Sequence, residues 1–123
     1  MRARPAWIFR VAVALAAVAA PFAASTASGE GYSRAPTPAW VEPVAHGRGD
    51  EATRSQAANG QYYLLVDTQH RVLSTGPSRY RRLVVEAINA SGVERAANIE
   101  IGFDPAFQTL ELHAIDVIRG GRV

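Results

Sequence analysis

The side chains of this sequence best suited to metal chemistry are three histidines and two nearby aspartates. They are His46, His70, His113, Asp67 and Asp116. A zinc-type site needs three or four ligands that converge at about 2.0–2.3 Å, yet no two of the histidines have a short strand or helix spacing. We therefore predict no metal and no cofactor. We interpret the histidines as polar side chains on strand faces, with His70 half-buried between Thr68 and Val72.

The sequence offers no combination of residues that would support catalysis. It has no cysteine, and no serine lies in the glycine-flanked motif of hydrolases. Its acidic side chains show no spacing that suggests a general acid and base pair. We interpret four of them as solvent-facing: Glu86, Glu94, Glu100 and Glu111. We therefore predict no catalytic residues and a chain that is not an enzyme.

Basic residues cluster around one aromatic residue at positions 79–82, a combination that can indicate nucleic-acid binding. Successive side chains of a strand point to opposite faces. Arg79 and Arg81 are thus predicted to lie on one face, and Tyr80 and Arg82 on the other. This separation argues against a nucleic-acid partner.

The overall charge also disfavours such a partner. All thirteen basic residues are arginines, and three of them lie within the first ten positions. If residues 1–27 are removed, ten arginines face eleven acids, a net charge of −1. A basic surface for nucleic acid or anionic lipid is then not supported.

Residues 1–27 have the three parts of a helical signal peptide: a positive start, an apolar centre and an exit rich in small residues. Ser25 and Ala27 suit a cut after Ala27, although a cut after Ser25 is nearly as favourable. The uncharged run, residues 11–24, is shorter than the roughly 20 residues of a membrane span. We therefore expect a periplasmic or secreted protein that touches the membrane only through the uncleaved leader.

Residues 28–60 are rich in proline and glycine and are predicted to form a flexible, extended lead-in. Trp40 and Val41 form an apolar island within it. Prolines on both sides forbid a helix or a central strand there, so this island would add a short edge strand or fill a groove. Residues 50–57 are compatible with either a loop or one weak helical turn.

Residues 61–73 and 79–88 are dense in β-branched and aromatic residues and predict two strands. Residues 74–78 contain Gly76 and Pro77, which favour a turn. The connection is short enough for the two strands to pair as a hairpin.

Two further strands are predicted, over residues 93–103 and 109–119. The first ends in a clear alternation of apolar and polar residues, although its start, residues 94–97, is equally compatible with a loop. The second changes its apolar phase midway, which favours a β-bulge near His113 and Ala114 over a strand covered on both faces. Between them, Asp104 is expected to cap a turn, and Phe107 to pack back on the sheet.

These elements predict an all-β fold: an antiparallel meander that forms part of a β-sandwich-like domain over residues 61–123. The glycine pair at 120–121 is followed by only two residues. This ending would leave the last strand with an unpaired edge. We therefore expect the domain to be incomplete at its C-terminus.

Several segments resemble the bacterial family called domain of unknown function 3857. They are residues 61–69 (QYYLLVDTQ), 80–82 (YRR), 90–94 (ASGVE), 101–113 (IGFDPAFQTLELH) and 117–121 (VIRGG). The resemblance covers about residues 38–123. It implies a β-rich domain that typically precedes a transglutaminase-like domain in secreted or periplasmic proteins, and it carries no catalytic residues onto these positions.

The resemblance implies a non-catalytic accessory or interaction domain. Its expected partner is a downstream transglutaminase-like domain, or a strand or peptide that pairs with an exposed sheet edge. One alternative is that the chain is the severed N-terminal fragment of a transglutaminase-like cysteine peptidase or amide transferase. Another is a free-standing small periplasmic binding protein.

Overall fold

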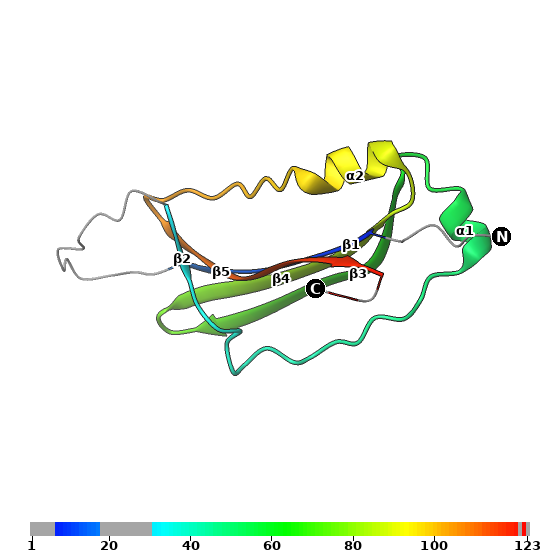
Figure 1. Cartoon of the computed structure of the whole chain (residues 1–123). Coiled ribbons are helices and arrows are strands. Elements are labelled where there is room, and N and C mark those ends of the chain that lie inside the picture. The colour runs from blue at the N-terminus through cyan, green and yellow to red at the C-terminus, as the bar shows by residue number, and fades with distance from the viewer. Residues whose placement is uncertain (1–6, 18–30, 121, 123) are drawn as a thin grey trace.

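The computed structural model describes residues 7–17, 31–120 and 122. They form, in chain order, β1 (Trp7–Ala17), β2 (Tyr32–Arg34), α1 (Glu51–Ser55), β3 (Gln61–Leu73), β4 (Gly76–Ala87), α2 (Ala90–Ala97) and β5 (Gln108–Arg119). The strands make one sheet in the order β2-β5-β1-β4-β3 (Figure 1). The β-rich class is as predicted, although the short β2 runs parallel to β5 and makes the sheet mixed.

The centre of the sheet is β1, and this position corrects two expectations. The apolar segment expected to be a leader helix is instead an extended strand, paired antiparallel with β4 on one side and β5 on the other. The meander is also wrong, because β4 and β5 are separated by β1 and run parallel to each other. Parallel strands cannot be joined by a hairpin, so α2 crosses one face of the sheet between them. The expected cleavage sites after Ser25 and Ala27 lie outside the described residues.

The predicted hairpin is confirmed by β3 and β4, whose pairing runs from Leu73 opposite Gly76 to Gln61 opposite Ala87. Gly76 has a φ of 126°, a conformation that L side chains rarely adopt. The turn is therefore tighter than predicted, and β4 begins three residues earlier. A register shift between Tyr63 and Leu65 places one extra residue in β3.

The predicted strand over 93–103 is wrong, because α2 occupies its first half. The side chain of Asn89 caps this helix by accepting a hydrogen bond from the backbone N–H of Gly92 at 2.8 Å. Ala96 is buried with Ala87 of β4, and Val93 packs against them. Because Val93 and Ala96 are three residues apart, a helix places both on the sheet, and this segment forms a helix instead of the expected strand. Residues 98–103 pair with no strand, although Ile101 and Phe103 pack against the sheet.

The predicted bulge in β5 is confirmed. Ala12 lies opposite Ala114, but the next residue, Val13, lies opposite Leu112, which leaves His113 as the extra residue. Since Val11 lies opposite Ile115, the apolar residues on both sides of the bulge face the same way.

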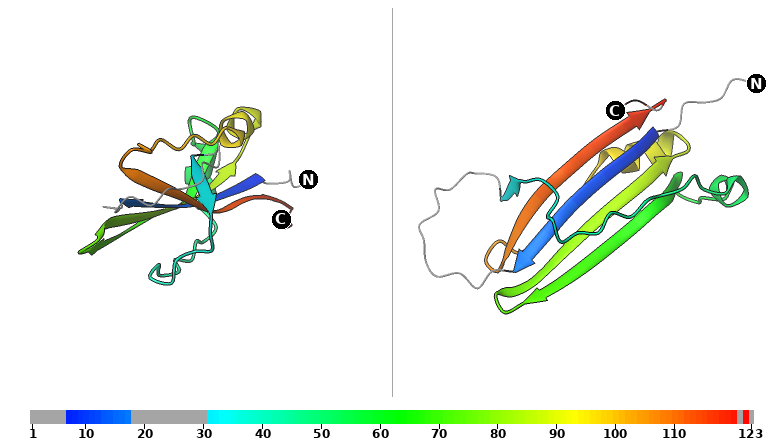
Figure 2. Two further views of the ribbon diagram at one scale, coloured as in Figure 1. Left: turned by 90° about the vertical axis from the view of Figure 1, so that its left-hand side faces the viewer. Right: turned by 90° about the horizontal axis from the view of Figure 1, so that it is seen from below.

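The sheet has two covered faces, which we call the helix face and the lead-in face. On the helix face lie α2 and residues 98–103, whereas residues 35–48 run across the lead-in face (Figure 2, right). Trp40 and Val41 pack there against Ala12, Ala14 and Tyr80, so they fill a groove rather than add a strand.

The described part of the lead-in is attached by specific hydrogen bonds. Gln69 accepts from the backbone N–H of Glu42 at 2.9 Å and donates to its carbonyl at 2.7 Å. Arg82 donates to the carbonyl of Val44 at 3.0 Å. The short helix α1 confirms the helical alternative for residues 50–57, and Asp50 caps it. No residue of α1 is buried, so polar contacts attach this helix to the rest of the protein.

The turn before β5 is partly as predicted. Asp104 accepts a hydrogen bond from the backbone N–H of Ala106 at 2.9 Å, which confirms its capping role. Phe107 was expected to pack on the sheet, but 73% of it is exposed. The turn bonds from residues 107 and 108 to the carbonyl of Asp104 hold the backbone so that Phe107 faces away. Within the described ranges, no helix is long and apolar enough to cross a membrane.

Candidate functional site

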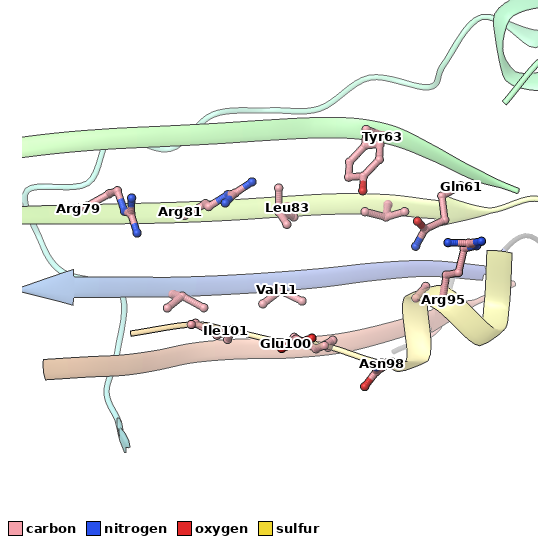
Figure 3. Close-up of a pocket in the computed structure, with 15 residues that line it drawn as sticks. Val11, Gln61, Tyr63, Arg79, Arg81, Leu83, Arg95, Asn98, Glu100 and Ile101 are labelled. Atoms are coloured by element: carbon pink, nitrogen blue, oxygen red, sulfur yellow. The ribbon is translucent and has the colours of Figure 1, made fainter. Parts of the chain in front are cut away.

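A groove of about 390 Å³ lies on the helix face. One side of it is formed by α2 and residues 98–102, and the floor by the helix face of β1, β4 and the start of β3 (Figure 3). Residues 98–102 have no strand partner and cover only part of this face. The groove is therefore a product of the crossover between β4 and β5.

The floor of the groove is apolar. Val11 and Val13 of β1 and Leu83 and Val85 of β4 line it. Val11 lies opposite Leu83 in the strand pairing, so the groove-facing side chains of the two strands lie side by side. Alternation within each strand thus produces a continuous apolar strip.

Three arginines border this strip. Arg79 and Arg81 project from β4, and Arg95 projects from α2 (Figure 3). The β3 residues opposite the β4 pair are His70 and Thr68, neither of which is acidic.

The charge of the groove is therefore basic. Glu100 is the acid among the lining residues, and no ion pair joins it to an arginine within the described part of the chain. Guanidinium groups form directional, paired hydrogen bonds with carboxylates. The groove is thus suited to a ligand that has apolar groups together with carboxylates.

The opposite face holds an ion pair that secures the lead-in. Arg54 of α1 donates to Glu86 of β4 at 2.5 Å and to Glu51 at 2.8 Å. The hydrogen bond that Arg54 donates to Glu51, aided by its bond to Glu86, raises the pKa of Arg54 despite burial. Glu86 was expected to face solvent, but only 7% of it is exposed, because α1 and the lead-in cover that end of β4.

A second hollow of about 290 Å³ lies between the lead-in and the sheet. Tyr80 lines it and is 3% exposed, and burial raises the pKa of its phenol, partly offset by the charge of Arg82. The ring of His113 lies 5.9 Å from that of Tyr80, and its Nδ1 is 2.8 Å from the carbonyl oxygen of Ala35. These contacts attach the lead-in to the sheet, and we assign this hollow a structural role.

The histidines and aspartates considered for metal binding do not gather. His46 contacts the carbonyl of the neighbouring Gly47, and His113 is on the lead-in face. His70 was expected to be half-buried, but it is exposed on β3. Asp67 accepts a hydrogen bond from Gln69, and Asp116 lies 4.0 Å from Arg10. No group of three potential metal ligands occurs among the residues that the structure describes.

The face separation predicted for residues 79–82 is confirmed, since Arg79 and Arg81 line the groove and Tyr80 and Arg82 line the second hollow. The contribution of Arg95 was missed. An asparagine at an N-cap position followed by Ala96 and Ala97 is a signal that could have indicated the helix that carries it.

Comparison with protein families gives one finding for this chain. Residues 76–123, from the start of β4 to the end of the chain, match the model of a family described as "Domain of Unknown Function with solved-structure structure (DUF3857)". Comparisons with curated proteins and with solved structures gave no match.

Proposed function

We propose, from the premise that residues 76–123 belong to the DUF3857 family, that this chain is a non-catalytic accessory domain that binds a polypeptide segment. The groove on the helix face is the proposed binding site. In this proposal the domain acts in a secreted or periplasmic protein, and a transglutaminase-like domain supplies the segment.

The observation that carries this proposal is the combination of an apolar floor with three bordering arginines. A floor of valine and leucine side chains favours apolar groups. The guanidinium groups of Arg79, Arg81 and Arg95 favour carboxylates placed at the rim. An extended segment in which acidic and apolar residues alternate presents both groups at once.

A non-catalytic role is supported by the chemistry of the lining. The groove contains no cysteine, histidine or serine, and its acid, Glu100, is solvent-exposed. These side chains are adequate for binding and orientation. A covalent acyl transfer would need a nucleophile and a base that the lining does not provide.

Binding of a defined peptide tests the proposal. The probe is a fluorescein-labelled eight-residue peptide of alternating valine and glutamate, measured by fluorescence anisotropy with the full chain. The double variant Arg79→Gln/Arg81→Gln is expected to weaken binding by about tenfold, since two charge-assisted contacts are lost. Higher salt should weaken binding to the unmodified chain as well.

The matched control is Arg34→Gln/Arg48→Gln, which removes the same charge from exposed positions outside the groove. It should leave the affinity within about twofold, as expected for distant screened charges. Equal losses in the two double variants would show nonspecific attraction and overturn the proposal. Equal binding of a peptide with lysine in place of glutamate would overturn it as well.

A further inference from the structure

The segment with the features of a signal peptide is the same segment that forms the central strand of the sheet. β1 spans Trp7–Ala17, inside residues 1–27. A cut after Ala27 would separate it from the rest of the chain. We propose that the slot between β4 and β5 is a strand-acceptor site, which the leader occupies before its removal and a strand from another polypeptide occupies afterwards. This inference rests on the proposed secretion and on the predicted cut after Ala27.

The pairing of β1 shows why the slot cannot stay empty. Its backbone pairs with β4 from Trp7 to Ala16 and with β5 from Trp7 to Ala17. Removal of β1 would leave two facing strand edges with unsatisfied N–H and C=O groups. It would also uncover Val84, whose exposure is 0% in the intact sheet.

A direct closure of the gap is disfavoured by the direction of the flanking strands. β4 and β5 are both antiparallel to β1 and so are parallel to each other. The pairing of β5 with β1 accommodates the extra residue of β5, His113. Direct pairing of β4 with β5 would need a parallel register and a new position for α2, which crosses between them.

The side chains around the slot define the chemistry of the strand that fits. On the lead-in face, Ala12 and Ala14 are 7% and 6% exposed and pack under Tyr80 and Trp40. On the helix face, Val13 is buried against Leu110. The occupant is thus an antiparallel strand that alternates alanine-sized residues on one face with β-branched residues on the other.

Strand exchange in the full chain tests this inference. A protease site inserted between Ala27 and Ser28 allows the folded protein to be cut after assembly. The probe is a fluorescein-labelled peptide with the sequence of residues 7–17 and a lysine pair at its C-terminus for solubility. The control peptide carries leucine at the positions of Ala12 and Ala14.

The cut protein is expected to retain residues 1–27 and to exchange them for the matching peptide, as followed by native mass spectrometry. The leucine peptide should bind at least about tenfold more weakly, because the closely packed lead-in face does not admit larger side chains. Unfolding in urea and refolding with excess peptide measures incorporation when spontaneous exchange is slow.

Three results would overturn the inference. One is a cut protein that loses residues 1–27, stays a monomer with an unchanged circular dichroism spectrum and takes up no peptide. The second is equal uptake of the two peptides, and the third is uptake of neither on refolding. Peptide uptake in the strand-exchange experiment does not depend on Arg79 or Arg81, so a failure of groove binding and a failure of strand exchange are distinguishable.

Discussion

At the scale of single residues, Glu86 is the acidic residue that is buried among those the structure describes. It lies on β4 and is 7% exposed, with Arg54 of α1 as its partner. A buried carboxylate is stable in its charged form only when it is paired. The pair therefore links the position of α1 to the sheet, although the two residues are 32 positions apart in sequence.

Replacing Glu86 with glutamine should lower the free energy of unfolding by about 1–3 kcal/mol, because Arg54 loses its less exposed partner. Urea denaturation followed by circular dichroism measures this change. Glu51→Gln is the control, since that acid also pairs with Arg54 but its side chain is 82% exposed. The control should change stability by less than about 0.5 kcal/mol. Equal effects of both substitutions would contradict a structural role for the buried pair.

At the scale of elements, the start of α2 depends on a close approach between two glycines. Gly60 has a φ of 70°, and its carbonyl accepts a hydrogen bond from the backbone N–H of Ile88 at 2.9 Å. A Cβ added to Gly92 would lie 1.9 Å from the same carbonyl oxygen. The helix therefore packs on the start of β3 only because position 92 has no side chain.

We expect Gly92→Ala to destabilise the protein by about 1–3 kcal/mol through this overlap. Destabilisation is the opposite of what helix propensity predicts, because alanine is favoured over glycine within a helix by about 1 kcal/mol. Gly102→Ala is the control, since a Cβ there meets no atom within 4 Å. Thermal and urea unfolding of the three proteins provide the comparison. A stabilised Gly92→Ala variant would show that α2 does not pack in this position.

The elements differ in how well local pattern predicts them. The hairpin β3–β4 and the bulge at His113 were predicted, because both depend on the periodicity of one strand and its neighbour. The helix α2 was not predicted, because the alternation of Ile99, Ile101 and Phe103 favours a strand that begins as early as Val93. That alternation is retained as packing on the sheet but without a strand partner.

At the scale of the whole molecule, β3 forms one outer edge of the sheet. Two of its apolar residues are among the most exposed, with Val66 at 58% and Val72 at 80%. Edge strands of this kind are prone to pair with other chains unless charges protect them. The expected partner strand at an exposed sheet edge is therefore best placed at β3, as a second proposed contact beside the groove.

We expect the full chain to self-associate through β3 at high concentration, and Val66→Lys/Val72→Lys to reduce this association by about tenfold or more. Sedimentation velocity over a range of concentrations measures it. Val44→Lys introduces a charge at an exposed residue outside the sheet and should have little effect. Association that is unchanged in the double variant, or reduced equally by Val44→Lys, would exclude β3 as the contact.

The sequence by itself determined the β-rich class, the hairpin, the bulge, the family resemblance confirmed for residues 76–123 and the opposite orientation of Arg79 and Tyr80. Each depends on local alternation or on a motif within one segment. Only the tertiary structure decided that β1 lies between β4 and β5, that Glu86 is buried and that Arg95 joins the groove. These features depend on which distant segments fill a vacant strand edge or cover a face, and the period of a single segment carries no information on either.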